Sequence, residues 1–423
     1  MESQDIYAAY REAEKAGDLD GCAACVLAAV QLASAHPEVE ETEALAFFED
    51  GRLMVVLAAA IFAMERGDDR LADYYLRAFP QGLLYKSAWF PEGHFFRGVL
   101  ALRAGDFGRA RELFGDHLAR FTGDAAAWLA IGNAAYHMGA FLPAVVAYGK
   151  ALEQRADLPE AAVNRDVALA QMLAPEGVAR PPIHEGLTFP MTIEAEDWEA
   201  VRHLPIFINC RDRVDCLSRL VTWLCTSGYD NIILIDNAST YPPLLRYYET
   251  IRAEGVRVVR LGSNLGHTAL WASRLLELLD IRTPYVYTDP DVLPTEACPA
   301  QFLQAFLRVL QEHPLISKVG AALAYEDLTY EYRERKAKNE RRFYHVPLGG
   351  DAYYANVDTT FALYRDARFY HRGPAIRMAG PYTFRHLPWY YDSDHLPEDE
   401  SYYLAHANDS SSTKAWMEKK VAE

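Results

Sequence analysis

The sequence lacks a long hydrophobic run. Its longest apolar stretch, Leu53 to Met64, is well short of the roughly 20 residues that an apolar helix needs to cross a bilayer. The first residues, Met1 to Asp5, are acidic and are not followed by the apolar segment of a secretory signal peptide. We therefore expect no transmembrane segment and a cytoplasmic protein, or one attached to a membrane only through a partner.

Cysteine is also scarce. The six cysteines are scattered, and Cys22 and Cys25, which have C-x-x-C spacing, lack a second pair or a histidine cluster. We interpret them as small buried helix residues rather than as a zinc or redox site. The low number suits a reducing compartment.

Positive charge is in short supply. The 42 Lys and Arg residues are outnumbered by 59 Asp and Glu residues, which gives a formal net charge of −17. Nucleic-acid binding requires basic surface to neutralise phosphates, so no nucleic-acid partner is expected. The local basic cluster from Arg333 to Arg342 is interpreted as a solvated helix face or a mobile loop.

Several nucleotide-binding and hydrolase motifs are missing. The chain contains neither G-x-x-x-x-G-K-[ST] nor G-x-G-x-x-G, which removes the usual signatures of P-loop and dinucleotide chemistry. The run from Gly262 to Gly266 has its serine one position too early for G-x-S-x-G. The position of this serine argues against a hydrolase.

What the sequence does contain, in its first part, is a recurring turn. Gly17-Asp18, Gly67-Asp68 and Gly105-Asp106 each interrupt an alanine-rich helical pattern, and Gly139-Ala140 takes the same place in a fourth unit. A small residue and then a larger apolar residue follow each glycine at fixed spacing: Cys22 and Val26, Ala72 and Leu76, Ala110 and Phe114, Ala144 and Tyr148. Small residues allow two antiparallel helices to approach closely, so this pattern predicts helical hairpins.

The last two units repeat with a period of 34 residues, as Gly98 and Gly132 illustrate, and 34 is the tetratricopeptide period. The residues that carry a resemblance to that family are Trp128, Ile131, Gly132, Ala144 and Tyr148. Ala135 departs from it, because the family usually has tyrosine there. Residues 1–172 are therefore predicted to form a TPR-like solenoid of four degenerate helical hairpins.

Helical solenoids often bind peptides or proteins on their concave face, so a protein acceptor or partner is one expectation for residues 1–172. The alternatives are that the array only braces the second domain or forms a homodimer interface. Residues 173–190 contain four prolines and two glycines, which cannot continue a helical hairpin. We therefore expect a linker at 173–200 and a second domain at 201–423.

Short apolar strands alternate with helical patterns after residue 204. The predicted strands are 206–208, 231–236, 256–261 and 285–287, and the predicted helices are 216–227, 244–254 and 268–280. This alternation predicts a mostly parallel sheet covered on both faces, with ligands bound beyond the carboxyl ends of the strands. Further strands are predicted at 318–324 and 359–364, with a mobile segment or lid between them at 326–342.

An Asp-x-Asp motif follows the fourth predicted strand. Asp289 and Asp291 flank Pro290, and two carboxylates in such a place suit a hard divalent cation such as Mn²⁺ or Mg²⁺. The motif alone is weak evidence, because Asp18 and Asp20, and Asp392 and Asp394, have the same spacing. Its position behind a buried strand of an α/β series favours the pair at 289.

Three short runs in fixed order resemble the GT-A glycosyltransferases, and family 2 in particular. They are Ile235-Asp236-Asn237-Ala238-Ser239-Thr240, Ser263-Asn264-Leu265-Gly266 and Asp289-Pro290-Asp291, and the resemblance covers about residues 204–295. The resemblance implies a Rossmann-like α/β domain that transfers a sugar from a nucleotide-sugar donor, a UDP- or GDP-sugar, to an acceptor.

The same resemblance implies roles for individual residues. Asp236 and Asn237 would contact the nucleotide, Asn209 and Arg211 would form another wall of its pocket, and Asn264 and Gly266 would line it. Asp289 and Asp291 would hold the metal against the diphosphate, where a cation offsets the charge of the leaving group. An ordinary turn after the strand is the alternative for Asp236 and Asn237, and a helix start is the alternative for Asn264 and Gly266.

Past residue 295 the resemblance weakens, and four further residues are candidates. Asp358 and Asp327 are candidate general bases for an inverting transfer, since the Glu-Asp base motif usual in family 2 is not obvious. His386 is a candidate third metal ligand, or else a histidine packed against aromatic residues. Lys414 would approach the diphosphate if the C-terminal segment folds over the donor; a frayed terminus is the alternative.

These expectations favour a metal-dependent glycosyltransferase whose repeats recruit a protein acceptor. Two other interpretations stay open. One is a transferase that builds a glycan such as lipopolysaccharide or capsule, with the repeats serving assembly. The other is a non-catalytic adaptor that keeps the repeats and a decayed transferase fold.

Overall fold

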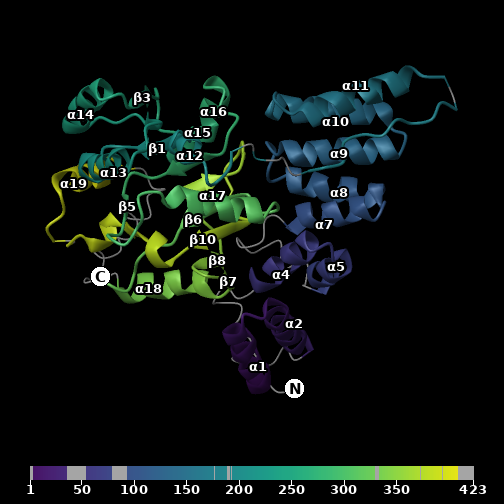
Figure 1. The fold of residues 1–423 in the computed structure, drawn as a ribbon, viewed down its shortest axis with the longest axis horizontal. Coiled ribbons are helices and arrows are strands. Elements are labelled where there is room, and N and C mark those ends of the chain that lie inside the picture. The colour runs from purple at the N-terminus through teal and green to yellow at the C-terminus, as the bar shows by residue number, and fades with distance from the viewer. Residues whose placement is uncertain are drawn as a thin grey trace.

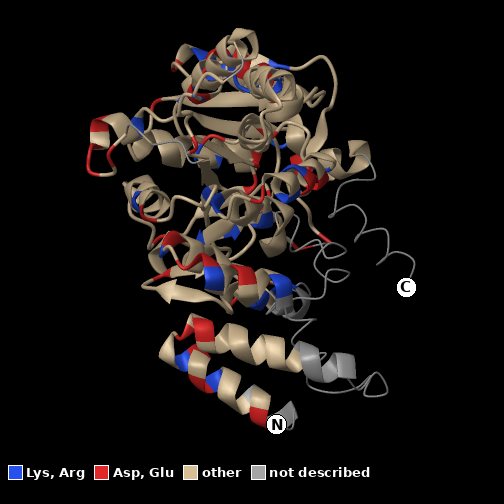
Figure 2. Cartoon of the chain, turned by 90° about the vertical axis from the view of Figure 1, so that its right-hand side faces the viewer, with Lys and Arg blue, Asp and Glu red and all other residues tan. Residues whose placement is uncertain are grey.

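The computed structural model describes residues 3–35, 54–78, 93–175, 177–187, 191, 193–328, 333–371, 373–392 and 394–407. A helical-repeat region and a mixed α/β domain lie side by side, with the repeats stacked along one flank of the sheet domain (Figure 1). Acidic and basic residues are interspersed along the helices (Figure 2). In the described part of the chain, no helix is long and apolar enough to cross a membrane.

The repeat region consists of paired antiparallel helices. They are α1 (Ser3–Ala16), α2 (Leu19–Ala35), α4 (Met54–Glu65), α5 (Asp69–Ala78), α7 (Gly93–Arg103), α8 (Phe107–Leu118), α9 (Ala125–His137), α10 (Phe141–Gln154) and α11 (Pro159–Leu173). The predicted hairpins correspond to α1–α2, α4–α5, α7–α8 and α9–α10, and α11 packs on α10.

The Gly-Asp pairs build the turn inside each hairpin. Gly17, Gly67 and Gly105 have φ values of +68°, +79° and +75°, a left-handed conformation that ends the first helix and that glycine adopts without strain. The aspartate that follows accepts a hydrogen bond from a backbone N–H in the first turn of the next helix, for example from Arg109 N to Asp106 Oδ1 at 3.1 Å. The dipeptide therefore caps both helices of the hairpin.

Glycines on the first helix of the last two hairpins receive aromatic rings from the second helix. A Cβ added at Gly98 would lie 2.9 Å from Phe114 Cζ, and one added at Gly132 would overlap the Tyr148 ring. Both rings are fully buried. The predicted close approach of the paired helices is present in the structure.

Replacing Gly132 by alanine should therefore destabilise the protein by about 1–3 kcal/mol, because the Tyr148 ring has no space to retreat in a packed core. The displaced ring would also strain the 2.9 Å hydrogen bond from Tyr148 Oη to Asn133 Oδ1. Urea unfolding of the full chain measures the change. Gly149→Ala is the matched control, because no described atom lies within 4 Å of the added Cβ. That variant should gain about 0.5–1 kcal/mol from its higher helix propensity.

The second domain is built on a sheet with the order β3-β2-β1-β4-β9-β6-β10-β8-β7. Its strands are β1 (Ile206–Cys210), β2 (Ile232–Asp236), β3 (Arg257–Arg260), β4 (Tyr285–Thr288), β6 (Lys318–Ala321), β7 (Pro347–Gly349), β8 (Ala352–Tyr354), β9 (Ala362–Tyr364) and β10 (Ala375–Met378). A separate antiparallel pair joins β5 (Val292–Pro294) to β11 (Phe384–His386).

Parallel pairing links β3, β2, β1 and β4, as predicted, but the remainder of the sheet is mixed. Strand β9 is antiparallel to both β4 and β6, and β8 is antiparallel to β10. The expectation of a mostly parallel sheet was wrong in this half, because the pairing of β9 depends on a contact between segments far apart in the sequence. The sheet domain is nevertheless α/β with both faces covered.

Strand residues alternate between two cores. The helices of this domain are α12 (Trp198–Arg202), α13 (Val214–Thr226), α14 (Pro242–Ala253), α15 (Ala269–Ala272), α16 (Leu275–Leu278), α17 (Phe302–Glu312), α18 (Arg333–Arg341) and α19 (Glu398–His406). Ile206 and Ile208 belong to the core that contains α13, α14 and α17. Phe207, on the opposite face, belongs to the core that contains α15 and α16.

One predicted helix differs from the structure, and a segment for which no single element was predicted contains a helix. The helix predicted at 268–280 is broken into a 3-10 turn at Gly266–Thr268 and the short helices α15 and α16, which Arg274 separates with a φ of +57°. The segment predicted to be mobile at 326–342 contains α18, which Glu340 anchors through a buried 2.9 Å ion pair with Arg377. Residues 329–332 lie outside the described residues.

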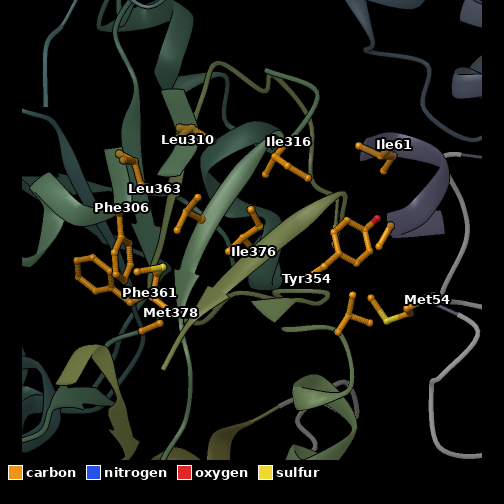
Figure 3. Close-up of a cluster of buried hydrophobic side chains, with 14 of the residues drawn as sticks. Met54, Ile61, Phe306, Leu310, Ile316, Tyr354, Phe361, Leu363, Ile376 and Met378 are labelled. Atoms are coloured by element: carbon orange, nitrogen blue, oxygen red, sulfur yellow. The ribbon is translucent and has the colours of Figure 1, made fainter. Parts of the chain in front are cut away.

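The repeats and the sheet domain share one hydrophobic core. Every residue from Met54 to Met64 in α4 is buried, and Met54 and Ile61 of this helix belong to the same hydrophobic cluster as Tyr354 of β8 (Figure 3). At the end of α4, the Glu65 carboxylate accepts a hydrogen bond from Leu315 N at 3.0 Å and lies 3.0 Å from His313 Nδ1. The repeat region is therefore packed against the sheet domain through α4 and is not a loosely tethered module.

Candidate functional site

Polar side chains gather at the carboxyl ends of β1 and β2. Asn237 Nδ2 donates to Gly266 O at 2.9 Å, and Asn209 Nδ2 donates to the same carbonyl at 3.2 Å. Asn264 Oδ1 accepts from Gly266 N at 2.9 Å. Gly266 has a φ of +69°, which explains why glycine stands there. The structure thus brings four of the predicted nucleotide-site residues together.

Asp236 holds the turn that follows β2. Its side chain is fully buried, and Oδ1 accepts from Ser239 N at 3.0 Å while Oδ2 accepts from Arg260 Nε at 2.8 Å. These hydrogen bonds are those of an ordinary turn residue, which was the alternative interpretation of Asp236 from the sequence. Arg211 lies on the neighbouring loop, where its Nη2 donates to His406 O of α19 at 3.3 Å.

The two carboxylates of the Asp-x-Asp motif lie where β4 ends. Asp289 Oδ2 accepts a hydrogen bond from the Thr359 hydroxyl, and Asp289 N donates to Thr359 O at 3.0 Å. Burial and the charge of Asp291 raise the pKa of Asp289 well above its ordinary value. The antiparallel β4–β9 pairing therefore brings Thr359 and its neighbour Asp358 beside the motif.

Asp291 pairs with Arg213, a residue that the sequence did not single out. Arg213 Nη1 lies 2.8 Å from Asp291 Oδ2, and its Nε and Nη2 bind the two oxygens of Glu400 at 2.6 Å each. All three side chains are buried. The other oxygen, Asp291 Oδ1, is buried without a hydrogen-bond partner in the described part of the chain.

Helix α19 supplies two buried acids that were also missed. Asp399 Oδ2 accepts from Val214 N and Asp215 N at 2.8 Å each, which caps α13, while Glu400 binds Arg213. The Glu-Asp pair at 398–399, followed by Glu400, was the available signal, since it opens a helix directly after Pro397. Its contact with the Asp-x-Asp motif is long-range and could not be inferred from spacing.

His386 reaches the site from β11, which pairs with β5 immediately after the motif. Its Nε2 lies 3.6 Å from Asp291 Oδ2, and its ring stacks on Trp389 with centroids 4.8 Å apart. Burial lowers the pKa of His386, which favours the neutral imidazole. The Lys336 ammonium group of α18 lies over the Trp389 side chain, 4.6 Å from its ring centroid. His386 therefore lies near Asp291 and also packs against an aromatic side chain, so features of both interpretations from the sequence are present.

Asp358 is the solvent-exposed carboxylate beside the motif. The surrounding protein would by itself raise the pKa of Asp358, but the Arg377 guanidinium, the hydrogen bond from Thr360 N and the Lys318 ammonium outweigh that effect and lower it. Lys318 and Arg377 are both buried beneath it. At neutral pH Asp358 is thus an ionised, accessible carboxylate.

Asp327 lies elsewhere. It binds Arg385 Nε at 3.1 Å and the Tyr390 hydroxyl at 2.7 Å, and Arg385 also pairs with Glu296. Because Arg385 and His386 are consecutive in β11, their side chains point to opposite faces of the strand. The structure therefore does not bring Asp327 to the carboxylates at 289 and 291. Lys414 lies outside the described residues.

The donor atoms around Asp291 are of the kind that bind a hard divalent cation, namely carboxylate oxygens and a neutral imidazole. The unpartnered, buried Asp291 Oδ1 fits such a ligand role. Nevertheless, no three acidic, histidine or cysteine side chains of the described chain are already spaced as a metal site. Instead, the Thr359 hydroxyl donates a hydrogen bond to one oxygen of Asp289, and Arg213 donates one to an oxygen of Asp291.

Fold and site together define a helical-repeat protein with a mixed-sheet α/β domain whose polar centre lies at the carboxyl ends of parallel strands. No protein-family model and no curated protein matches the chain. Solved structures with some similarity include two of MamA, at TM-scores of 0.30 and 0.28 and identities of 18% and 17%. They cover 40% and 38% of this chain and 82% and 84% of those chains.

A mutant of the Thermobaculum terrenum O-GlcNAc transferase is another similar structure, with a TM-score of 0.25 and 17% identity. The match covers 54% of this chain and 43% of that one, so the chain spans less than half of that enzyme's length. At these TM-scores the similarities carry no argument about function. The site must be interpreted from its own geometry.

Proposed function

We propose that this chain is a metal-dependent glycosyltransferase of the GT-A type, which moves a sugar from a nucleotide-sugar donor to an acceptor. The main support is one arrangement: Asp289 and Asp291 end β4, and the exposed Asp358 adjoins them at the start of the neighbouring β9 segment. The order β3-β2-β1-β4, followed by an antiparallel strand, is consistent with the resemblance seen in the sequence.

The loops after β1 and β2 would form the nucleotide pocket. Asn209 and Asn237 fix the Gly266 loop by hydrogen bonds, and Asp236 fixes the turn that follows β2. These bonds make the pocket walls rigid, so a nucleotide would bind with little further loss of conformational entropy. Arg211, on the loop that follows β1, would supply positive charge for the donor.

Asp289, Asp291 and His386 are the residues proposed to hold Mn²⁺ or Mg²⁺. When bound, the cation would offset the negative charge that develops on the leaving nucleoside diphosphate. Arg213 already partners Asp291 and orients that carboxylate. The hydrogen bond from the Thr359 hydroxyl orients one oxygen of Asp289.

Asp358 is the proposed general base. Buried cations beneath it keep the carboxylate ionised, which is the form that accepts a proton. It would take the proton of the acceptor hydroxyl while that oxygen bonds to the anomeric carbon and the bond to the diphosphate oxygen breaks. Asp399 and Glu400 are less suited, because in this arrangement helix capping and Arg213 already occupy them.

The acceptor is proposed to be a protein that the TPR-like repeats recruit. The support is that the repeats are rigidly packed on the sheet domain through α4, so a polypeptide bound to them would be held at a fixed distance from the site. If the protein transferred the sugar to a glycan primer and not to any polypeptide, the glycan-building alternative would be favoured over a protein acceptor.

Thermal unfolding with a panel of nucleoside diphosphates and nucleotide sugars tests the proposal. A ligand at 100 times its dissociation constant should add about 2.7 kcal/mol to the stability. We expect this gain with one nucleotide sugar in Mn²⁺ or Mg²⁺ and its loss when EDTA removes the metal. No gain with any donor would favour the non-catalytic adaptor, and a gain that persists in EDTA would contradict metal dependence.

A further inference from the structure

A pocket of about 140 Å³, here called the interdomain pocket, lies where the repeats meet the sheet domain. The repeats contribute residues of α7 and α8 and the residue that caps α9. The sheet domain contributes the segments that precede β6 and β10 and the segment that follows β9. The lining includes three phenylalanines and two histidines, namely Phe95, Phe96, Phe369, His117 and His371. None of the residues of the candidate functional site lines it.

His117 has one ring nitrogen that is bound and one that is not. Its Nε2 lies 2.8 Å from Asp124 Oδ2, and Asp124 Oδ1 accepts from Ala126 N and Ala127 N at the start of α9. Because a carboxylate only accepts, Nε2 carries the proton of this hydrogen bond. Nδ1 is buried and has no hydrogen-bond partner among the residues that the structure describes. In the neutral imidazole, Nδ1 is therefore an acceptor without a donor.

His371 shows the same division with its nitrogens exchanged. Its Nδ1 lies 3.2 Å from Gly373 O and 3.4 Å from Ser317 Oγ, while the Ser317 hydroxyl donates to Pro374 O at 2.7 Å. Both neighbours of Nδ1 can thus only accept from it, which places the proton there. Burial, with a smaller contribution from the Lys318 ammonium, lowers the pKa of His371 well below its ordinary value, so the ring is neutral. Its Nε2 is a second buried acceptor without a partner in the described chain.

The two imidazoles therefore require a hydrogen-bond donor from outside the protein. A buried polar atom that leaves water without a new partner is costly. Here one such atom comes from the repeats and the other from the sheet domain, and both residues line the same pocket. A ligand that donates to both nitrogens would recover this cost.

The rest of the lining favours a positively charged donor with an apolar body. Asp124 and Asp366 line the interdomain pocket, the latter in an ion pair with Arg155, and none of its described lining residues is Lys or Arg. Phenyl faces attract a cation electrostatically. A water molecule would donate to the ring nitrogens but would leave those faces uncovered. The volume is close to the roughly 150 Å³ of a cavity that binds benzene, so the occupant is about the size of one six-membered ring.

We propose that the interdomain pocket binds a small primary amine in its ammonium form. The ammonium group donates to His117 Nδ1 and His371 Nε2, and the apolar body packs against the phenylalanines. A primary ammonium has three N–H groups, enough for both nitrogens and one further acceptor. A divalent metal ion suits the pocket less, because no three acidic, histidine or cysteine side chains in the described ranges are spaced as a metal site. This inference is independent of sugar transfer by the sheet domain.

Calorimetric titration of the full-length protein with cyclohexylamine and with cyclohexanol tests the proposal. The two probes share a six-membered ring and one polar atom, but the amine is protonated at neutral pH, as a lysine side chain is. High ionic strength screens nonspecific attraction of the amine to the acidic protein surface. We expect the amine to bind roughly tenfold more tightly than the alcohol, because charge-assisted hydrogen bonds and phenyl faces both favour the cation. Equal binding of the two probes, or no binding of the amine, would overturn the proposal.

Two variants remove the unpartnered nitrogens and keep the hydrogen bonds that the protein already makes. The amide nitrogen of glutamine takes the place of Nε2, so His117→Gln keeps a donor for Asp124 but has no group in place of Nδ1. The amide nitrogen of asparagine takes the place of Nδ1, so His371→Asn keeps a donor for Gly373 O but has none in place of Nε2. Each variant should bind cyclohexylamine roughly tenfold more weakly than the wild type.

His137→Gln is the matched control for these variants. His137 Nε2 lies 2.9 Å from Glu185 Oε1, and His137 does not line the interdomain pocket. This substitution should leave the affinity for cyclohexylamine unchanged. Wild-type affinity in both His117→Gln and His371→Asn would refute the assigned contacts. Thermal unfolding shows whether each variant is folded, and the comparison of amine with alcohol in the wild type decides the proposal if one is not.

Discussion

Asp291→Asn should abolish metal-dependent donor binding and slow sugar transfer roughly 1,000-fold, which corresponds to about 4 kcal/mol of lost transition-state stabilisation. Asparagine keeps the volume and one oxygen but lacks the negative charge that a divalent cation requires. Arg213 retains its two-point contact with Glu400, so the variant should stay folded. Thermal shift with Mn²⁺ and the nucleotide sugar measures binding, and product formation measures transfer.

Asp327→Asn is the matched control for this experiment. It makes the same chemical change in a carboxylate that binds Arg385 and Tyr390 on the opposite face of β11. It should leave the metal-dependent shift and the transfer rate unchanged. Undiminished transfer by Asp291→Asn would remove the assigned metal role, and equal losses in both variants would point to a general effect on the fold.

Local patterns in the sequence were sufficient to predict the repeats, because the contacts that build them are close in sequence. Gly105-Asp106 ends one helix and caps the next, and Gly132 meets Tyr148 within a single hairpin. Apolar runs likewise predicted β1, β2 and β4, whose residues are buried on both faces. In these cases propensity, spacing and packing all favour the same structure.

Predictions failed where distant contacts override the local pattern. The regular apolar spacing of residues 268–280 suggested one helix, but Arg274 adopts a left-handed conformation and the chain packs as two short helices. Strand β9 inserts between β4 and β6 although it lies far from both in the sequence. The spacing of apolar residues along the sequence gives no information about such long-range strand pairings.

The same reason limits the prediction of the site. Asp289 and Asp291 could be found because they follow a recognisable strand, but Arg213 and Glu400, which complete their surroundings, are separated by 187 residues.

The linker shows a related limit. Its prolines and glycines predicted a non-helical segment, yet composition gave no indication that Asn133 and Asn164 would bind its backbone.

Arg213→Met should destabilise the protein by about 3–5 kcal/mol, because it leaves Asp291 and Glu400 as buried carboxylates without a compensating cation. Methionine preserves most of the packing of the side chain, so the loss would reflect charge rather than a cavity. Urea unfolding measures it. Adding Glu400→Gln to this variant should restore part of the stability, since it removes one of the unpaired charges; no restoration would contradict the ion-pair explanation.

The same variant tests whether Arg213 competes with the metal. In the wild type the guanidinium occupies Asp291 Oδ2, so a divalent cation must share that carboxylate with it. Without Arg213, no Lys or Arg side chain of the described residues forms an ion pair with Asp289 or Asp291, so the cation would supply the compensating charge. Mn²⁺ should therefore stabilise Arg213→Met more than the wild type, measured as the difference in unfolding free energy with and without EDTA. An equal or smaller effect would mean that Arg213 does not oppose the cation but helps the carboxylates to bind it.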